Sequence, residues 1–230
     1  MDEMEELDLA MELTDDGSAT LFIPQLNEHY HSVKGAITES NHIYRDCAFL
    51  HRCVAMANDA DRRPYRLLEV GFGTGLNACV TAMVANEACP VHYISLEKYP
   101  VNNQVLNTLR YEELVDADLW KAIHEAPWGE ATAITPYFVI EKRNVDYLTT
   151  SLPENIDVVY FDAFAPEKQP EMWTLDAFRR LVSVLNRGAM LTTYCAKGEI
   201  RRLFGSLGLH VERIAGPKGG KREILRATFS

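Results

Sequence analysis

The chain has no long uninterrupted hydrophobic run. None of its apolar segments reaches the ~18 residues that a membrane-spanning helix needs, and the acidic start at residues 1–6 is the reverse of the basic start of a signal peptide. The five cysteines are odd in number and include no C-x-x-C pair. A disulfide framework and a metal site are therefore disfavoured, and we expect a cytoplasmic protein with reduced thiols, no bound metal and no membrane partner.

The chain is also short of positive charge, with 23 Lys and Arg against 33 Asp and Glu and a net charge of -10. This balance argues against nucleic acid, because phosphate contacts dominate that kind of affinity. The distribution is uneven, however, since residues 179–230 carry a net charge of +8 and residues 1–178 one of -18. The basic part indicates a face that meets a polyanion; solvated helix faces without a partner are the alternative.

The length of 230 residues fits one α/β domain with a small appendage. Residues 1–60 form the expected appendage. Within it, strand-like runs at 9–13 and 19–23 around a turn predict a hairpin, and apolar spacing over 40–57 predicts a helix. Residues 61–230 form the expected main domain.

The main domain alternates between strand and helix patterns. Strands are expected at 66–70, 91–97, 137–141, 157–162, 188–193, 208–214 and 222–229. Helices are expected at 75–87, 101–109, 117–125, 172–185 and 198–206. The alternation predicts a parallel sheet with helices on both faces. The last two strands must pair antiparallel, because the segment 215–221 between them is too short for a crossover.

Three glycines follow the first strand of the main domain in a G-x-G-x-G pattern: Gly71, Gly73 and Gly75. Glycine lets the backbone turn sharply and approach a ligand without a Cβ in the way. A dinucleotide-binding loop would have its third glycine one residue later, where this chain has Leu76. The shorter spacing favours S-adenosylmethionine, which has no pyrophosphate, over a nicotinamide cofactor; a tight turn without a ligand is the alternative.

Ligands of open α/β sheets lie beyond the carboxyl ends of the strands. Glu97 ends the second strand and is placed to hold ribose hydroxyls, and Asn144 after the third could receive an adenine amine. Asp162 ends the fourth strand, with Phe164 and Trp173 close behind it. A carboxylate among aromatic residues resembles a pocket for a cationic or flat substrate.

Methyl transfer to an amine requires a free lone pair in line with the methyl group. A carboxylate can accept a hydrogen bond from the amine, orient it and help remove its proton. Asp162 is therefore the candidate catalytic residue, and a helix cap is the alternative for it.

Longer stretches carry a more specific likeness: EVGFGTGLN at 69–77, DAFAPEKQPEMW at 162–173, NEHYHS at 27–32, Glu39, and KREIL at 221–225. With them the chain resembles, from about residue 9 onward, the methyltransferases that complete 5-methylaminomethyl-2-thiouridine at the wobble position of bacterial tRNA. The resemblance implies a class I S-adenosylmethionine-dependent methyltransferase fold, a Rossmann-like α/β fold whose mostly parallel seven-stranded sheet ends in an antiparallel hairpin. It also implies N-methylation of 5-aminomethyl-(2-thio)uridine.

The resemblance and the strand-end positions together give the expected site. The cofactor-binding residues are Tyr30, Glu69, Gly71, Phe72, Gly73, Gly75, Leu76, Asn77, Glu97, Lys98, Asn144, Val145 and Asp162. The residues for substrate and tRNA are His31, Phe164, Trp173, Lys218, Lys221 and Arg222. By this resemblance the segment 30–32 closes over the site and the final hairpin contacts phosphates of the anticodon loop.

The resemblance has two departures. In many bacteria this domain is fused to a flavin oxidoreductase, whereas this chain has no second nucleotide motif; it resembles a stand-alone methyltransferase half, with a separate oxidoreductase as the implied partner. The family often has a Gly-Asp pair where this chain has Arg143-Asn144, which leaves the adenine contact open.

Two other functions remain as alternatives. An aminopropyltransferase of the spermidine-synthase type shares the hairpin, the glycine loop and a strand-four Asp, but it favours a polar run after that Asp and needs no basic C-terminal part. A non-catalytic S-adenosylmethionine sensor would bind the cofactor without turnover. For His31 alone, an ordinary packing histidine is the alternative.

Overall fold

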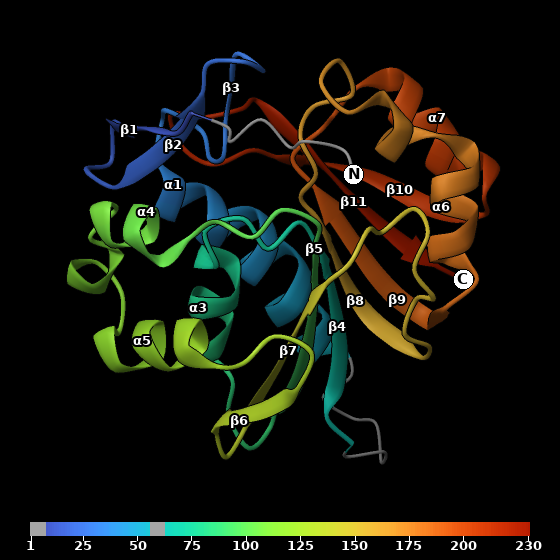
Figure 1. The fold of residues 1–230 in the computed structure, drawn as a ribbon. Helices are drawn as coiled ribbons and strands as arrows, with labels where there is room; N and C mark the ends of the chain where they lie inside the picture. Colours follow the sequence, from blue (N-terminus) through green and yellow to red (C-terminus); the bar gives the residue numbers. More distant parts are fainter. Residues whose placement is uncertain (1–7, 56–62) are drawn as a thin grey trace.

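The computed structural model of the protein describes residues 8–55 and 63–230 (Figure 1). Within them lie a small sheet of order β1-β2-β3 and an eight-stranded sheet of order β10-β11-β9-β8-β4-β5-β7-β6. The acidic start at 1–6, the expected helix end at 56–57 and the expected domain boundary after residue 60 lie outside the described residues.

The small sheet comprises β1 (Ala10–Leu13), β2 (Ala19–Ile23) and β3 (Glu28–His29). The large sheet comprises β4 (Tyr65–Val70), β5 (Val91–Glu97), β6 (Ala131–Thr135), β7 (Phe138–Asn144), β8 (Ile156–Phe161), β9 (Leu185–Thr193), β10 (Leu209–Ala215) and β11 (Glu223–Phe229). The helical segments are α1 (Ala36–Glu39), the π-helical η1 (Ser40–Leu50), α2 (His51–Ala55), α3 (Leu76–Ala82), α4 (Asn103–Thr108), the 3-10 turn η2 (Tyr111–Glu113), α5 (Ala117–Glu125), the 3-10 turn η3 (Pro170–Trp173), α6 (Leu175–Val182) and α7 (Gly198–Ser206).

The topology confirms the predicted fold class. Strands β7, β5, β4, β8 and β9 run parallel, and β11 pairs antiparallel with both β9 and β10. The expected number of seven strands was one short, because β6 adds an eighth at the edge, antiparallel to β7. The hydrophobic pattern did not indicate β6, since this edge strand is only five residues long and none of its residues is buried.

The predicted N-terminal hairpin is confirmed as the β1–β2 pair. The helical segment after it begins at Ala36, four residues earlier than expected, and runs through α1, η1 and α2. The helix expected at 172–185 starts later: Pro170–Trp173 form a separate turn, and the Thr174 hydroxyl then accepts a hydrogen bond from the amide of Ala177 to cap α6.

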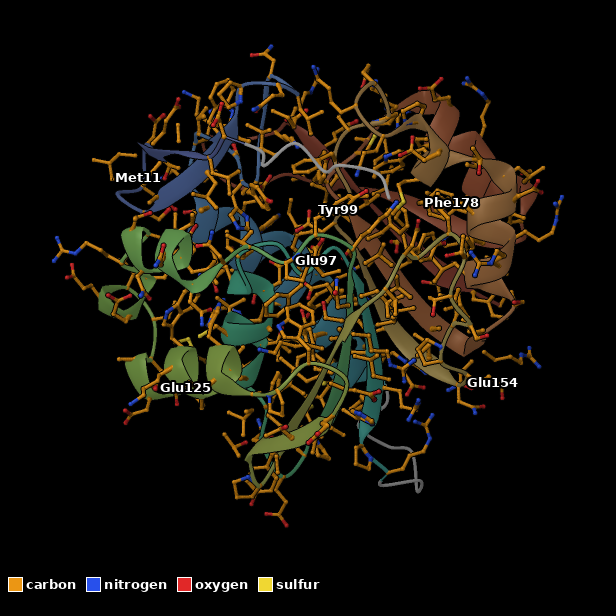
Figure 2. All side chains as sticks on the ribbon, viewed as in Figure 1. Met11, Glu97, Tyr99, Glu125, Glu154 and Phe178 are labelled. Carbon is orange, nitrogen blue, oxygen red and sulfur yellow. The ribbon has the colours of Figure 1, made fainter. Side chains whose placement is uncertain are left out.

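Helices cover both faces of the large sheet (Figure 1). One hydrophobic cluster joins η1, α3 and α5 to the sheet residues Tyr93 and Tyr160, and a second joins α6 and α7 to Val159 and Phe161. Strand β8 is buried along its whole length, as a central parallel strand must be. Phe178 of α6 lies fully buried with its ring 4.6 Å from that of Phe161 (Figure 2).

The N-terminal segment packs directly on the main domain. Ala19 and Leu21 of β2 belong to the same hydrophobic cluster as Tyr111 of η2. The Tyr111 hydroxyl, which is buried, donates a hydrogen bond of 2.5 Å to the carbonyl oxygen of Ala19. The N-terminal appendage and the main domain therefore share one hydrophobic core. The predicted domain boundary near residue 60 stays a prediction.

The Tyr111→Phe variant should lose stability, because the Ala19 carbonyl oxygen would be left buried without a partner. We expect a loss of about 1–3 kcal/mol in the free energy of unfolding, measured by urea denaturation. Tyr137→Phe is the matched control, since Tyr137 is 39% exposed and should change stability little. Equal effects of the two variants would contradict a specific role for the Tyr111 hydroxyl.

Candidate active site

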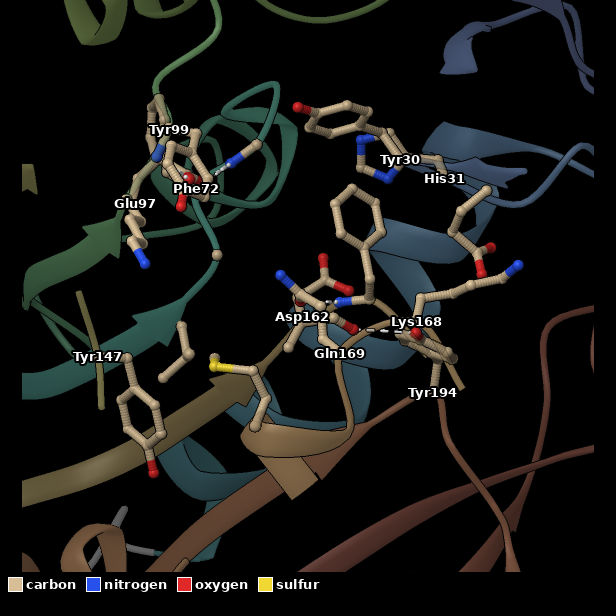
Figure 3. Close-up of a pocket in the computed structure, with 18 of the residues that line it drawn as sticks. Tyr30, His31, Phe72, Glu97, Tyr99, Tyr147, Asp162, Lys168, Gln169 and Tyr194 are labelled. Carbon is tan, nitrogen blue, oxygen red and sulfur yellow. Dashed lines mark hydrogen bonds between the residues drawn. The ribbon is translucent and has the colours of Figure 1, made fainter. Parts of the chain in front are cut away.

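A cavity of about 700 Å³ opens at the carboxyl ends of β4, β5, β7 and β8 (Figure 3). The appendage forms part of its wall. The predicted site residues that line it are Tyr30, His31, Gly71, Phe72, Gly73, Glu97, Lys98, Val145, Asp162, Phe164 and Lys221. Segments that are far apart in the sequence thus line one cavity.

The glycine loop fits closely against the end of β8. A Cβ on Gly71, whose φ is +93°, would lie 2.7 Å from the carbonyl oxygen of Asp162, and one on Gly73, whose φ is +52°, would lie 3.1 Å from the Tyr30 ring. Glycine is required at both places. Glu97 is oriented by this loop, because its carboxylate accepts hydrogen bonds from the amides of Gly73 (3.0 Å) and Tyr99 (2.8 Å).

Three predicted cofactor residues lie behind the loop and do not line the cavity: Glu69, Gly75 and Leu76. Glu69 is fully buried and accepts a hydrogen bond from the Ser95 hydroxyl at 2.7 Å. Burial raises the pKa of Glu69 to about 8, so this side chain is mostly protonated at neutral pH. Gly75, in the left-handed conformation, precedes the first residue of α3, Leu76.

Asn144 is also placed differently from the expectation. Its side-chain amide donates hydrogen bonds to the carbonyl oxygens of Glu97 (3.0 Å) and Lys98 (3.1 Å), and it does not line the cavity. Val145 and Asp146 line the cavity in its place, and Asp146 pairs with Lys98 at 3.0 Å. Asn144 lies opposite Glu97 in the β7–β5 pair, so its side-chain hydrogen bonds link the ends of these two strands.

Asp162 lies at the floor of the cavity and is held by two donors. The Tyr44 hydroxyl donates to Oδ1 at 2.5 Å, and the Asn77 amide donates to Oδ2 at 2.8 Å. Burial raises the pKa of Asp162 to about 7, and the nearby Glu39 adds to this rise, while the Tyr44 and Asn77 hydrogen bonds and Lys221 oppose it. Asn77 therefore acts on Asp162 and does not itself line the cavity.

Aromatic side chains surround this carboxylate. The rings of Tyr30 and Phe164 meet edge to face with centroids 5.3 Å apart. Trp173, by contrast, is 6% exposed and lies outside the cavity. Its indole nitrogen donates to the carbonyl oxygen of Phe164 at 2.8 Å, so Trp173 holds the loop that presents Phe164.

His31 links the appendage to the glycine loop. Its Nε2 lies 2.8 Å from the hydroxyl of Thr74, and burial lowers its pKa to about 4. The ring is therefore neutral near pH 7 and bonded to the protein, which agrees with the alternative of a packing histidine, although it also lines the cavity.

Several cavity or contact residues were missed from the sequence: Glu39, Tyr44, Tyr99, Asp146 and Tyr194. Glu39 had entered only through the resemblance. The remaining predicted tRNA residues, Lys218 and Arg222, flank Lys221 in the loop between β10 and β11 but lie outside the cavity. No spacing pattern in the sequence marked these residues. Packing of the appendage on the sheet brings Glu39 to the cavity and Tyr44 to Asp162. Tyr99, Asp146 and Tyr194 follow β5, β7 and β9 and reach the cavity through the order of the strands.

No group of three or more His, Cys, Asp or Glu side chains in the described part of the chain could hold a metal ion. No helix there is long and apolar enough to cross a membrane.

A family model described as S-adenosyl-L-methionine-dependent methyltransferase matches residues 139–230. The tRNA 5-methylaminomethyl-2-thiouridine biosynthesis bifunctional protein MnmC of Delftia acidovorans is 28% identical to this chain over 91% of its length. The crystal structure of MNMC2 from Aquifex aeolicus matches with a TM-score of 0.74 at 25% identity, covering 99% of this chain and 72% of that chain. The predicted resemblance is confirmed. The findings also support the predicted enzyme class and its cofactor, S-adenosylmethionine.

The chain spans about a third of the curated relative it matches, 34% in the Delftia protein. Spermidine synthase from Thermotoga maritima is similar with a TM-score of 0.55 at 11% identity, a likeness that concerns the fold alone. The aminopropyltransferase alternative therefore has the weaker match.

The Gly73→Asp variant should lose S-adenosylmethionine binding, because a side chain and a charge would enter the narrow space between the loop, Tyr30 and Glu97. Isothermal titration calorimetry measures this directly. Gly205→Asp is the matched control, since a Cβ on Gly205 of α7 meets nothing within 4 Å. Unchanged cofactor affinity in Gly73→Asp would mean that the cofactor binds elsewhere.

Proposed function

We propose that this chain transfers a methyl group from S-adenosylmethionine to the primary amine of 5-aminomethyl-(2-thio)uridine at the wobble position of tRNA. The observation that carries the proposal is the position of Asp162, a half-buried carboxylate that lines the cavity together with the glycine loop and the aromatic rings of Tyr30 and Phe164. The similarity to proteins of 5-methylaminomethyl-2-thiouridine biosynthesis gives the same substrate.

The residues present fit the cofactor. Gly71 and Gly73 leave backbone surface free that a Cβ would fill. Glu97, Val145 and Asp146 line the same cavity; Glu97 would hold the ribose hydroxyls, and Val145 and Asp146 would contact the adenine. When bound, S-adenosylmethionine supplies an electrophilic methyl group whose bonding electrons remain on sulfur after transfer.

Asp162 prepares the nucleophile in this mechanism. A primary amine arrives mostly as an ammonium, which has no lone pair. The ionised Asp162 carboxylate accepts a hydrogen bond and then a proton from it, which frees the nitrogen to form its bond to the methyl carbon. Tyr44 and Asn77 fix the carboxylate, so the amine is held in one orientation.

The tRNA is the proposed macromolecular partner. Phe164 and Tyr30 offer ring faces to a base turned out of the anticodon loop, as single-stranded bases commonly stack on aromatic side chains. Lys218 and Arg222, exposed beside the cavity, are placed for anticodon-loop phosphates. We further propose that a separate flavin oxidoreductase supplies this substrate on the same tRNA, and that both proteins act in the cytoplasm.

Methyl transfer from labelled S-adenosylmethionine to tRNA from cells lacking this activity tests the function. Label should appear as 5-methylaminomethyl at the wobble uridine. Asp162→Ala should lose most turnover, by about 10²-fold or more, while still binding the cofactor. Transfer of an aminopropyl group from the decarboxylated cofactor to putrescine would instead indicate an aminopropyltransferase. Cofactor binding without either reaction would indicate a sensor. Full turnover in Asp162→Ala would remove Asp162 from the mechanism.

The rate should depend on pH through Asp162. Since its carboxylate form is the active one and its pKa is about 7, kcat should rise as the pH increases through this range. Tyr44→Phe removes a hydrogen bond that lowers the pKa of Asp162, so the rising limb should move to higher pH. Tyr137→Phe, far from Asp162 in the fold, should leave the pH profile unchanged; an identical profile for Tyr44→Phe would show that Asp162 does not set it.

A further inference from the structure

The end of the cavity near Asp162 holds a second carboxylate and an unusual cation. Glu39, at the end of α1, is 6% exposed, and its carboxylate accepts a hydrogen bond from the Ser32 amide at 2.8 Å. The Lys221 ammonium lies 3.5 Å from the centre of the Tyr194 ring. It is 3.8 Å from the Glu39 carboxylate. Figure 3 shows Tyr194 and Asp162 at this end, away from Glu97.

We infer that Tyr194, Glu39 and Asp162 form a subsite for a primary ammonium group, and that the side chain of Lys221 occupies this subsite in the structure. The ligand class is an alkylammonium carried on a flat ring. This inference rests on the proposed function, because it assigns the place of the substrate's aminomethyl group before methyl transfer.

The surroundings of the Lys221 ammonium favour a positive charge but make few direct contacts with it. Two carboxylates, the buried Glu39 and the half-buried Asp162, line the cavity, and desolvation raises the pKa of each. A positive charge there offsets their repulsion and lies over the electron-rich face of Tyr194. Yet among the described residues the Lys221 ammonium has no hydrogen-bond partner, and its nearest carboxylate oxygen is 3.8 Å away.

Lys221 can leave without a change in the backbone. The loop is fastened at its base, where the Gly216 amide donates to the Arg222 carbonyl oxygen at 3.0 Å, and a Cβ on Gly216 would lie 1.7 Å from the Lys221 carbonyl oxygen. The Lys221 side chain is 40% exposed, so rotation about its own bonds can carry the ammonium to solvent. There it joins Lys218 and Arg222 on the phosphate-facing side of the hairpin.

The ring of Tyr194 is held in position independently of Lys221. Its hydroxyl donates to the Ala163 carbonyl oxygen at 2.9 Å, and its ring lies 6.4 Å from that of Trp173. The subsite therefore keeps its shape when Lys221 leaves. A substrate ammonium on this ring face would have Asp162 as its proton acceptor.

Binding of benzylammonium tests the inference, because this probe carries a primary ammonium on a flat ring and needs neither tRNA nor cofactor. Lys221→Met removes the resident charge while keeping the length of the side chain. It should bind benzylammonium about fivefold to tenfold more tightly than the unchanged protein, measured by NMR titration. Benzyl alcohol, the neutral counterpart, should show no such gain.

Further variants separate the parts of the subsite. In the Lys221→Met background, Tyr194→Phe should keep the gain because the ring remains, whereas Tyr194→Leu and Glu39→Gln should each remove it. Lys121→Met, which deletes a lysine charge on α5, is the control and should leave affinity unchanged. Lys221→Gln repeats the main measurement, and thermal unfolding checks that each variant is folded.

Unchanged or weaker binding of benzylammonium in folded Lys221→Met and Lys221→Gln would overturn the inference, as would an equal gain for benzyl alcohol. These outcomes are separate from the fate of the proposed function. If the protein methylates tRNA but neither Lys221 variant gains affinity for benzylammonium, only the ammonium subsite is refuted. If the variants gain affinity but the protein does not methylate tRNA, only the proposed reaction is refuted.

Discussion

The close contact between the ends of β4 and β8 is the constraint on which the site depends. Gly71 lies against the Asp162 backbone so tightly that a Cβ would approach the carbonyl oxygen to 2.7 Å, and the Asp162 amide donates to the Val70 carbonyl oxygen at 3.0 Å. Neighbouring parallel strands thereby bring the cofactor loop and the proposed proton acceptor together. A side chain at position 71 would separate them.

The N-terminal appendage supplies the part of the cavity wall that the large sheet does not. Tyr30 covers the glycine loop, and Tyr44 holds Asp162 at 2.5 Å. Glu39, from the same helical segment, supplies a second carboxylate at the cavity end. The small sheet and its helix are thus part of the proposed chemistry, because an α/β sheet alone would leave Asp162 facing open space.

The charges of the cavity follow a simple balance. Buried carboxylates are costly unless a cation or hydrogen-bond donors offset them. Asp162 has two donors, Glu39 has one backbone amide, and Lys221 places a cation between them and the Tyr194 ring. The proposed ammonium substrate would bring a positive charge of its own to the same carboxylates.

The sequence by itself determined the fold class, the glycine loop and the strand-end positions of Glu97 and Asp162, because strand alternation and strand-end residues are local patterns. It did not reveal the edge strand β6, none of whose residues is buried, or the break before α6. Only the tertiary structure decided that Asn144 fastens two strands, that Trp173 supports Phe164, and that Glu39, Tyr44 and Tyr194 meet at Asp162. Tyr44 and Asp162 are 118 positions apart, Asn144 and Glu97 lie on neighbouring strands, and packing alone sets such contacts.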